Sequence, residues 1–120
     1  MDWEGAGVSG WGDYDKNVLY SPEACGLRLI GELEDGNAFY TFDTIIVVQD
    51  IESGRVYAAH DAGCSCPTPF EDFHSFDDLT EIRTADELRA FIKAHDGGYD
   101  LDWPLAEQQA LYRKVREVLP

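Results

Sequence analysis

Residues 39–48 read Phe-Tyr-Thr-Phe-Asp-Thr-Ile-Ile-Val-Val, a dense run of aromatic and β-branched side chains. These residue types fit the pleated surface of a sheet, and an apolar run with no polar face is typical of a strand buried on both sides. The stretch therefore predicts the central strand of the fold, around which the other elements are arranged.

A turn signal and a further strand pattern lie on each side of this run. Residues 27–34 have the two-residue period of a half-buried strand, whose apolar positions are Leu27, Leu29, Gly31 and Leu33. Asp35-Gly36 then favours a tight hairpin turn. After the central run, residues 52–55 mark a second turn and residues 56–59 form the returning strand. The pattern predicts an antiparallel meander over residues 18–61, to which residues 18–20 could add an edge strand.

After residue 82 the hydrophobic period becomes helical. Thr84-Ala85-Asp86-Glu87 has capping-box spacing, in which Thr84 accepts from the third helical amide and Glu87 reaches back to the cap amide. Gly97-Gly98 suits a left-handed helix end, and His95 before it is interpreted as structural because a positive charge is favourable there. A second helix opens at Asp102-Trp103-Pro104, where Trp103 could wedge the two helices together. Its apolar stripe consists of Leu105, Leu111, Tyr112, Val115, Val118 and Leu119.

These patterns predict a single α+β domain over residues 1–120, in which an antiparallel meander of three to four strands is followed by two C-terminal helices packed on one face. Its parts are an irregular N-terminal arm (1–15), the meander (18–61), a cysteine- and proline-containing loop (62–82) and a helical part (84–119).

Acidic residues dominate the charge of the chain, which is -15 at pH 7. Residues 1–103 carry 22 acids and 6 bases, whereas residues 104–120 carry 2 acids and 3 bases. Such a body repels nucleic acid and phospholipid headgroups and attracts a basic protein partner. There is no apolar run long enough to span a bilayer and no signal-peptide pattern, so we expect a cytoplasmic protein.

Residues 61–72 place two of the three cysteines in a C-x-C pair followed by two prolines. A disulfide between such close cysteines would be strained, so we expect reduced thiols. The favoured interpretation is a structural loop formed by Cys64, Cys66, Pro67, Pro69 and Phe70, with Phe70 and Phe73 plugging the core. The alternative is a zinc site from His60, Cys64, Cys66 and His74, to which Cys25 or His95 could contribute.

Two catalytic interpretations of the same region are less favoured. A reactive thiolate needs a neighbouring positive charge, whereas Asp61, Glu71 and Asp72 surround this loop in sequence. A divalent-metal hydrolase could use carboxylates from the set Asp43, Asp50, Asp61, Glu71, Asp72, Asp77 and Asp78. Basic residues that would hold a phosphodiester substrate are scarce in the body, so we do not expect an enzyme, and no cofactor other than possible zinc is predicted.

Candidate protein-binding residues are the acids that follow the cysteine loop and two N-terminal tryptophans. The acids are Glu71, Asp72, Asp77 and Asp78. Trp3 and Trp11 could be exposed anchors, since tryptophan is enriched at binding hot spots, although packing on the body is the favoured interpretation.

A family resemblance rests on Ser21-Pro22-Glu23, Gly26-Leu27, Gly54-Arg55-Val56-Tyr57 and the D-x-G-C-S-C-P-x-P-F-E pattern of residues 61–71. Over residues 21–79 the chain resembles a family of small acidic proteins of unknown function encoded by phages of actinobacteria. The resemblance implies expression in the cytoplasm of an infected bacterium and supplies no catalytic residues.

Three function hypotheses follow from these residues. The first is an acidic phage accessory protein that binds a host or phage protein, covering a basic nucleic-acid-binding surface in the manner of a DNA mimic. The second is a small zinc-stabilised domain with a structural or regulatory role, and the third is a metal-dependent hydrolase.

Overall fold

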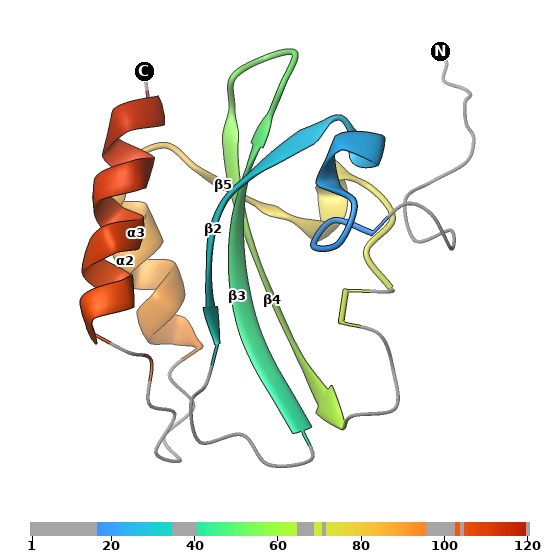
Figure 1. Cartoon of the computed structure of the whole chain (residues 1–120). Coiled ribbons are helices and arrows are strands. Elements are labelled where there is room, and N and C mark those ends of the chain that lie inside the picture. Colours follow the sequence, from blue (N-terminus) through green and yellow to red (C-terminus); the bar gives the residue numbers. More distant parts are fainter. Residues whose placement is uncertain are drawn as a thin grey trace.

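The computed structural model describes residues 17–34, 41–64, 69–70, 72–95, 103 and 105–119. Along the chain these residues form η1 (Pro22–Cys25), β2 (Leu27–Glu34), β3 (Thr41–Asp50), β4 (Val56–Cys64), η2 (Phe76–Asp78), β5 (Thr80–Ile82), α2 (Ala85–Ala94) and α3 (Leu105–Val118). The strands pair antiparallel in the order β2-β3-β4-β5, and the two long helices lie on one side of the sheet (Figure 1). The predicted α+β class, with an antiparallel sheet followed by two C-terminal helices, is confirmed.

Strand β3 is the centre of the fold, as residues 39–48 predict. Ile45 and Val47 belong to the hydrophobic cluster under the helices, whereas Ile46 and Val48 belong to a second cluster on the opposite face. All four side chains are fully buried. Successive strand side chains point to opposite faces, so a continuous apolar run fits a strand that is covered twice.

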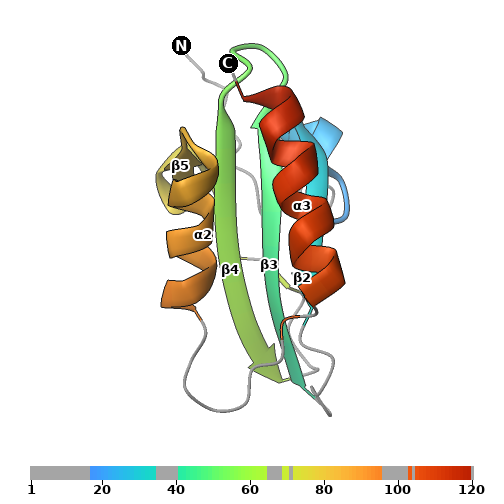
Figure 2. The ribbon, with the colours of Figure 1, turned by 90° about the vertical axis from the view of Figure 1, so that its left-hand side faces the viewer.

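The helix layer covers the first face, with α3 against β2 and α2 beside β5 (Figure 2). Leu88 and Leu111 are buried there together with Trp103, which lies two residues before α3. The hydroxyl of Thr84 accepts a hydrogen bond from the Glu87 amide, as a capping box requires. The return bond differs from the prediction, because the Glu87 carboxylate accepts from the amide of Arg83 rather than from the cap amide.

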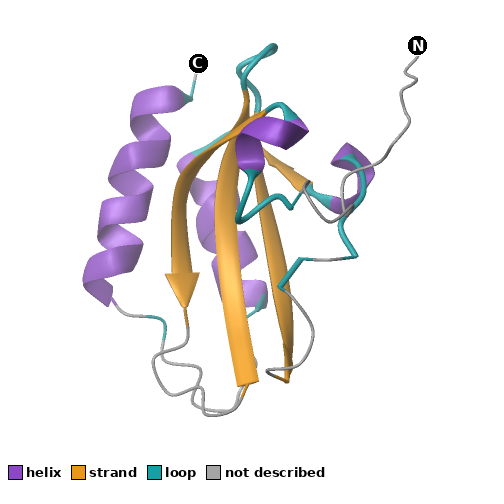
Figure 3. Ribbon diagram, turned by 45° about the vertical axis from the view of Figure 1, so that its right-hand side comes forward, coloured by secondary structure: helices purple, strands orange, loops and turns teal. Residues whose placement is uncertain are grey.

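The second face of the sheet is covered by chain without long helices, namely η1 with its preceding turn and residues 69–70 and 72–79 (Figure 3). Val18 and Phe70 are fully buried in this cluster. The predicted edge strand at residues 18–20 is wrong, because these residues form a turn. The Asn17 side chain accepts hydrogen bonds from the amides of Leu19 and Tyr20, and such local side-chain bonding competes with strand pairing.

Strand β2 departs from the simple alternation that its sequence indicates. Its register shifts between Leu29 and Gly31, which is the signature of a bulge. Leu27 and Leu29 therefore pack in the second cluster, whereas Leu33 packs under the helices. Gly31 also faces α3, because a Cβ built on it would lie 2.7 Å from Leu111 Cδ1. The interpretation of these four positions as one buried face is wrong.

The predicted loop over residues 62–82 contains more regular structure than its prolines indicate. Strand β4 continues to Cys64, and after η2 the chain returns as β5, which pairs Val56 with Ile82. The hairpin turn after β3 is as predicted, with Gly54 at φ 81°. Leu105 is 68% exposed and does not belong to the apolar stripe of α3.

Several predicted features lie outside the described residues: the arm 1–15 with Trp3 and Trp11, the turn at 35–36, and the helix end at 97–98. Among the helices that the structure describes, none has the length and apolar character needed to cross a membrane.

Candidate functional site

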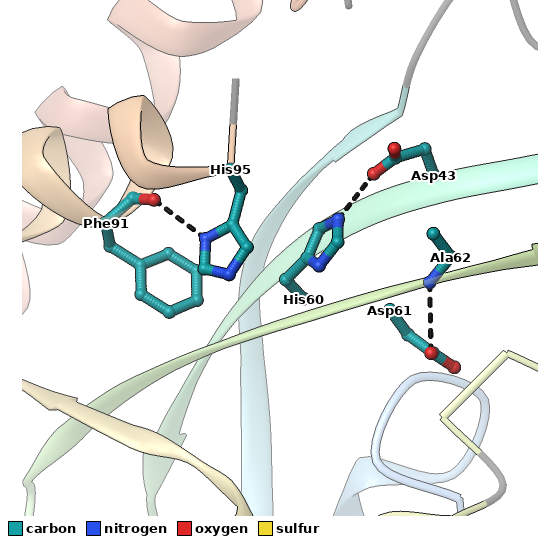
Figure 4. Close-up of polar contacts among 6 residues, drawn as sticks. All are labelled: Asp43, His60, Asp61, Ala62, Phe91 and His95. Carbon is teal, nitrogen blue, oxygen red and sulfur yellow. Dashed lines mark hydrogen bonds and ion pairs between the residues drawn. The ribbon is translucent and has the colours of Figure 1, made fainter. Parts of the chain in front are cut away.

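A cluster of polar and aromatic side chains lies where β3 and β4 pass the C-terminal end of α2 (Figure 4). His60 on β4 and Asp43 on β3 are joined by a hydrogen bond of 2.6 Å between Nε2 and Oδ1. His95, the C-cap residue of α2, stacks on His60 with ring centroids 4.3 Å apart and planes 28° from parallel. The backbone carbonyl of Phe91 lies 2.9 Å from His95 Nδ1. We call these four residues the histidine cluster.

The sheet register explains why these side chains meet. His60 pairs with Ile45, which faces the helices, so His60 points to the same face, and Asp43 lies two residues from Ile45 on that face. The side chains of His60 and Asp43 are 22% and 19% exposed, so the pair is partly shielded but open to solvent. The arrangement can hold a proton on a defined ring nitrogen and leave the other nitrogen free to bind a ligand.

The predicted zinc ligands are not brought together in the part of the chain that is described. His60 faces the helices, whereas His74 belongs to the segment that covers the opposite face. His60 and Cys64 are four positions apart on β4, which places their Cα atoms about 13 Å apart. No group of three or more histidine, cysteine, aspartate or glutamate side chains that could hold a metal is found among the described residues. Cys25 is buried, while the side chains of Cys64 and Cys66 lie outside the described set.

Three of the predicted metal-binding carboxylates hold the chain in place at separate points. Asp43 bonds to His60, and Asp50 accepts from the Ser53 hydroxyl in the hairpin turn at 2.6 Å. Asp61 accepts from the amide of Phe70 at 2.8 Å across the cysteine loop. Each has a local partner, so the structure describes structural roles for them and no shared ion site.

Asp61 and Asn17 anchor the end of the cysteine loop from two sides. The Asn17 side-chain amide donates to the carbonyl of Pro69 at 2.9 Å, next to the Asp61 contact with Phe70. Phe70 is fully buried, and its ring packs edge-on against Phe73 with centroids 5.1 Å apart. Phe70 also has φ 65°, a left-handed conformation that non-glycine residues rarely adopt. Pro67 and Cys66 lie outside the described residues.

Residues 72–78, which we call the acidic turn, contain three of the predicted binding acids. Asp72, Asp77 and Asp78 are all exposed, whereas Glu71 is not described. The Asp78 carboxylate accepts from the amides of His74 and Ser75 and completes a capping box for η2. Phe76 in the same turn is 38% exposed and packs against Tyr57 on β4. The turn is therefore well ordered and presents both acidic and aromatic surface.

Basic side chains gather on the other side of the molecule. An open hollow of about 560 Å³ on α2 and α3 is lined by Arg89, Tyr112, Arg113 and Arg116 among others. Arg89 lies over the Tyr112 ring at 4.9 Å and pairs with Asp86 at 2.8 Å. The charge asymmetry of the sequence is thus also an asymmetry in space, because α2 and α3 pack on the face opposite the acidic turn.

The sequence offers His60 and His95 as candidate ligands of one zinc site and Asp43 as a member of a separate carboxylate set, but no local pattern indicates that the three side chains lie together. Strand alternation could have placed His60 on the face of Val56 and Ala58, but the arrival of His95 there depends on helix packing. His95 is at the helix end, as predicted.

Comparison with curated proteins and comparison with solved structures each gave no match. A family described as "Domain of unknown function (DUF7574)" matches residues 16–119, which covers the sheet, both faces and the two helices. The chain belongs to this family of domains of unknown function.

Proposed function

We propose that this protein is a non-enzymatic acidic accessory protein, of the kind that actinobacterial phages encode, and that it binds a basic surface of a host or phage protein. The observation that carries the proposal is the acidic turn, where exposed carboxylates and an exposed phenylalanine lie on a fixed backbone. Aromatic side chains are enriched at protein-binding surfaces, and the rim of such a surface is polar.

The backbone of the turn is held from both ends. Phe70 and Phe73 anchor its start in the second cluster, and the capping box of Ser75 and Asp78 fixes its end. A preordered turn loses little conformational entropy on binding, which favours affinity. The remaining acids, Asp72 and Asp77, are then available to a partner.

Long-range charge supports the same proposal. The chain carries -15, and five of its nine basic residues lie on α2 and α3, away from the acidic turn. A basic partner would be steered towards the acidic side and would associate faster at low salt. A partner surface that normally binds nucleic acid has the required charge, which supports the DNA-mimic form of the proposal.

The test uses a variant that removes charge without disturbing the turn. Asp72→Asn with Asp77→Asn is suitable, whereas Asp78 must stay because its carboxylate caps η2. The matched control is Glu52→Gln with Glu117→Gln, which makes the same charge change at exposed positions on the hairpin and on α3. Far-ultraviolet circular dichroism checks that each variant is folded.

Partners are captured from an actinobacterial lysate on the immobilised wild-type protein, and association rates with the captured protein are measured by surface plasmon resonance. The Asp72/Asp77 variant is expected to associate more slowly and with weaker salt dependence, while the control keeps the wild-type rate. Double-stranded DNA is expected to compete for the partner. Equal rates in all three proteins, or capture of no protein above the blank resin, would contradict the proposal.

A further inference from the structure

Strand β2 lies at one edge of the sheet. Within the described part of the chain it pairs with β3 alone, and Figure 2 shows it as the last strand on the side of α3. An edge strand presents a row of unpaired backbone N–H and C=O groups that can pair with another chain. The edge strand on the other side, β5, has three residues, whereas β2 has eight. Strand β2 is therefore the longer template for an added strand.

The bulge in β2 limits which residues can serve as that template. The register shifts between Leu29 and Gly31, and a bulge bends its strand and interrupts regular pairing. After the shift, residues 31–34 pair with residues 47–44 of β3 without a further break. We call residues 31–34 the docking edge.

Two carboxylates of the docking edge point to the same face of the sheet. Glu32 and Glu34 pair with Ile46 and Thr44, so they lie on the face opposite the helices. Both residues are exposed, and neither has a hydrogen-bond or ion-pair partner among the described residues. Partial burial, and then the charge of Glu34, raise the pKa of the Glu32 carboxyl. Lysine or arginine at alternate positions of an added strand would lie directly opposite, with Cβ atoms about 5 Å apart.

The helix side of the docking edge has a small hollow between β2 and α3. Its volume is about 100 Å³, and it is lined by Gly31, Glu32, Glu107, Ala110, Leu111 and Lys114. Gly31 brings no side chain to this space, and a Cβ at that position would lie 2.7 Å from Leu111 Cδ1. A residue of an added strand opposite Gly31 or Leu33 would point to this face. The hollow therefore suits a small apolar side chain of the added strand.

A second copy of the chain does not fit the docking edge. Antiparallel pairing of two docking edges, with the helices of both copies on the same side, places Glu32 opposite Glu34 or Glu32 of the other copy. Like charges directly opposite each other destabilise a strand pair. The net charge of -15 on each chain adds to this repulsion, whereas it attracts a basic segment.

We propose that the docking edge binds an extended segment of a partner protein in which basic and small apolar residues alternate. Backbone hydrogen bonds to β2 contribute affinity, and the alternating side chains contribute specificity. The basic residues face Glu32 and Glu34, and an apolar residue enters the hollow beside α3. The acidic turn precedes β5 at the opposite edge of the sheet. The proposal therefore does not depend on the function proposed for the acidic turn.

The test is a nuclear magnetic resonance titration of the isotope-labelled full-length protein at about 0.15 M salt, where long-range attraction is screened. The probe is a short capped peptide in which lysine alternates with valine. The amide signals of residues 31–34 and of Ala110 are expected to shift, while those of the acidic turn stay in place. A peptide with glutamate in place of lysine is expected to bind roughly 10-fold more weakly or less.

Backbone methylation of the lysine peptide separates strand pairing from simple charge attraction. Alternate amides of an added strand face β2, and the others face solvent. Methylation of one alternate set is expected to abolish binding, and methylation of the other set is expected to preserve it. Attraction between charges alone would affect both methylated peptides equally.

Two variants with matched charge test the carboxylates. Glu32→Gln with Glu34→Gln is expected to weaken binding of the lysine peptide about 2- to 30-fold. Glu52→Gln with Glu117→Gln makes the same charge change at exposed positions outside the docking edge and is expected to bind as the wild type does.

The variant Asp72→Asn with Asp77→Asn tests whether the acidic turn takes part, and it is expected to bind the lysine peptide as the wild type does. The proposal is overturned if no signal of residues 31–34 shifts, if both methylated peptides bind equally, or if the Glu32/Glu34 variant binds as tightly as the wild type. Loss of binding in the Asp72/Asp77 variant, or a dimer of the free protein that pairs through residues 31–34, would also overturn it.

Discussion

Phe70 is fully buried and has a left-handed backbone conformation. Burial favours a large apolar side chain at this position, whereas the backbone conformation favours glycine. Removing the ring in Phe70→Ala leaves a cavity beside Phe73, at an expected cost of about 3 to 5 kcal/mol. With about 250 cal/mol/K of unfolding entropy for a domain of this length, the melting temperature is expected to fall by roughly 12 to 20 °C.

Phe70→Gly removes the same ring but also relieves the backbone. An L-residue in the left-handed region costs about 1 to 2 kcal/mol relative to glycine, while glycine loses about 0.4 to 1 kcal/mol through the entropy of the unfolded chain. The difference leaves Phe70→Gly more stable than Phe70→Ala by about 1 kcal/mol, or roughly 4 °C. At most sites alanine is the more stable of the two.

Val48 supplies the matched control, because it is fully buried in the same cluster but lies within β3. There Val48→Ala is expected to be more stable than Val48→Gly by about 0.5 to 1 kcal/mol. Urea and thermal denaturation followed by circular dichroism measure all four variants. The reasoning is refuted if Phe70→Ala is as stable as Phe70→Gly, because the strain assigned to this position would then be absent.

Three other substitutions examine the helix layer and the edge strand. Gly31→Val is expected to lower the free energy of unfolding by about 1 to 3 kcal/mol, because the added carbons meet Leu111. Leu111→Ala in the same chain should recover part of this loss in a urea double-mutant cycle, and additive effects of the two substitutions would contradict a close contact. Partial burial, and then the charge of Glu34, raise the pKa of the Glu32 carboxyl above 4.5. The contribution of Glu32 to the free energy of unfolding is therefore complete below that pH and is lost as the pH rises through the folded-state pKa. Glu32→Gln is therefore expected to raise the urea midpoint at about pH 7 and to leave it unchanged below about pH 4, and a lower midpoint near neutrality would contradict the sign. Thr84→Ala removes the cap bond at 3.1 Å and is expected to cost about 0.5 to 2 kcal/mol in thermal denaturation, while an unchanged melting temperature would show that the cap is dispensable.

The sequence alone determined those elements that depend only on residues close to one another in the chain. The apolar run of β3 predicts burial on both faces, and the Gly54 turn and the Thr84 cap each depend on a few neighbouring residues. Hydrophobic period and turn chemistry are short-range properties, so they can be read without knowing what packs against them.

Tertiary structure decided what depends on partners distant in the chain. The bulge in β2 moves Gly31 to the helix side because α3 approaches there, and β5 forms because β4 offers it an unpaired edge. Residues 17–26, 69–70 and 72–79 cover the second face without any periodic pattern, since their positions depend on bonds such as that of Asn17 to Pro69. His60 and His95, 35 positions apart, become neighbours only when α2 packs on the sheet. A sequence pattern indicates which face of an element is apolar. The packing energy between complete elements then determines which of these apolar faces contact each other.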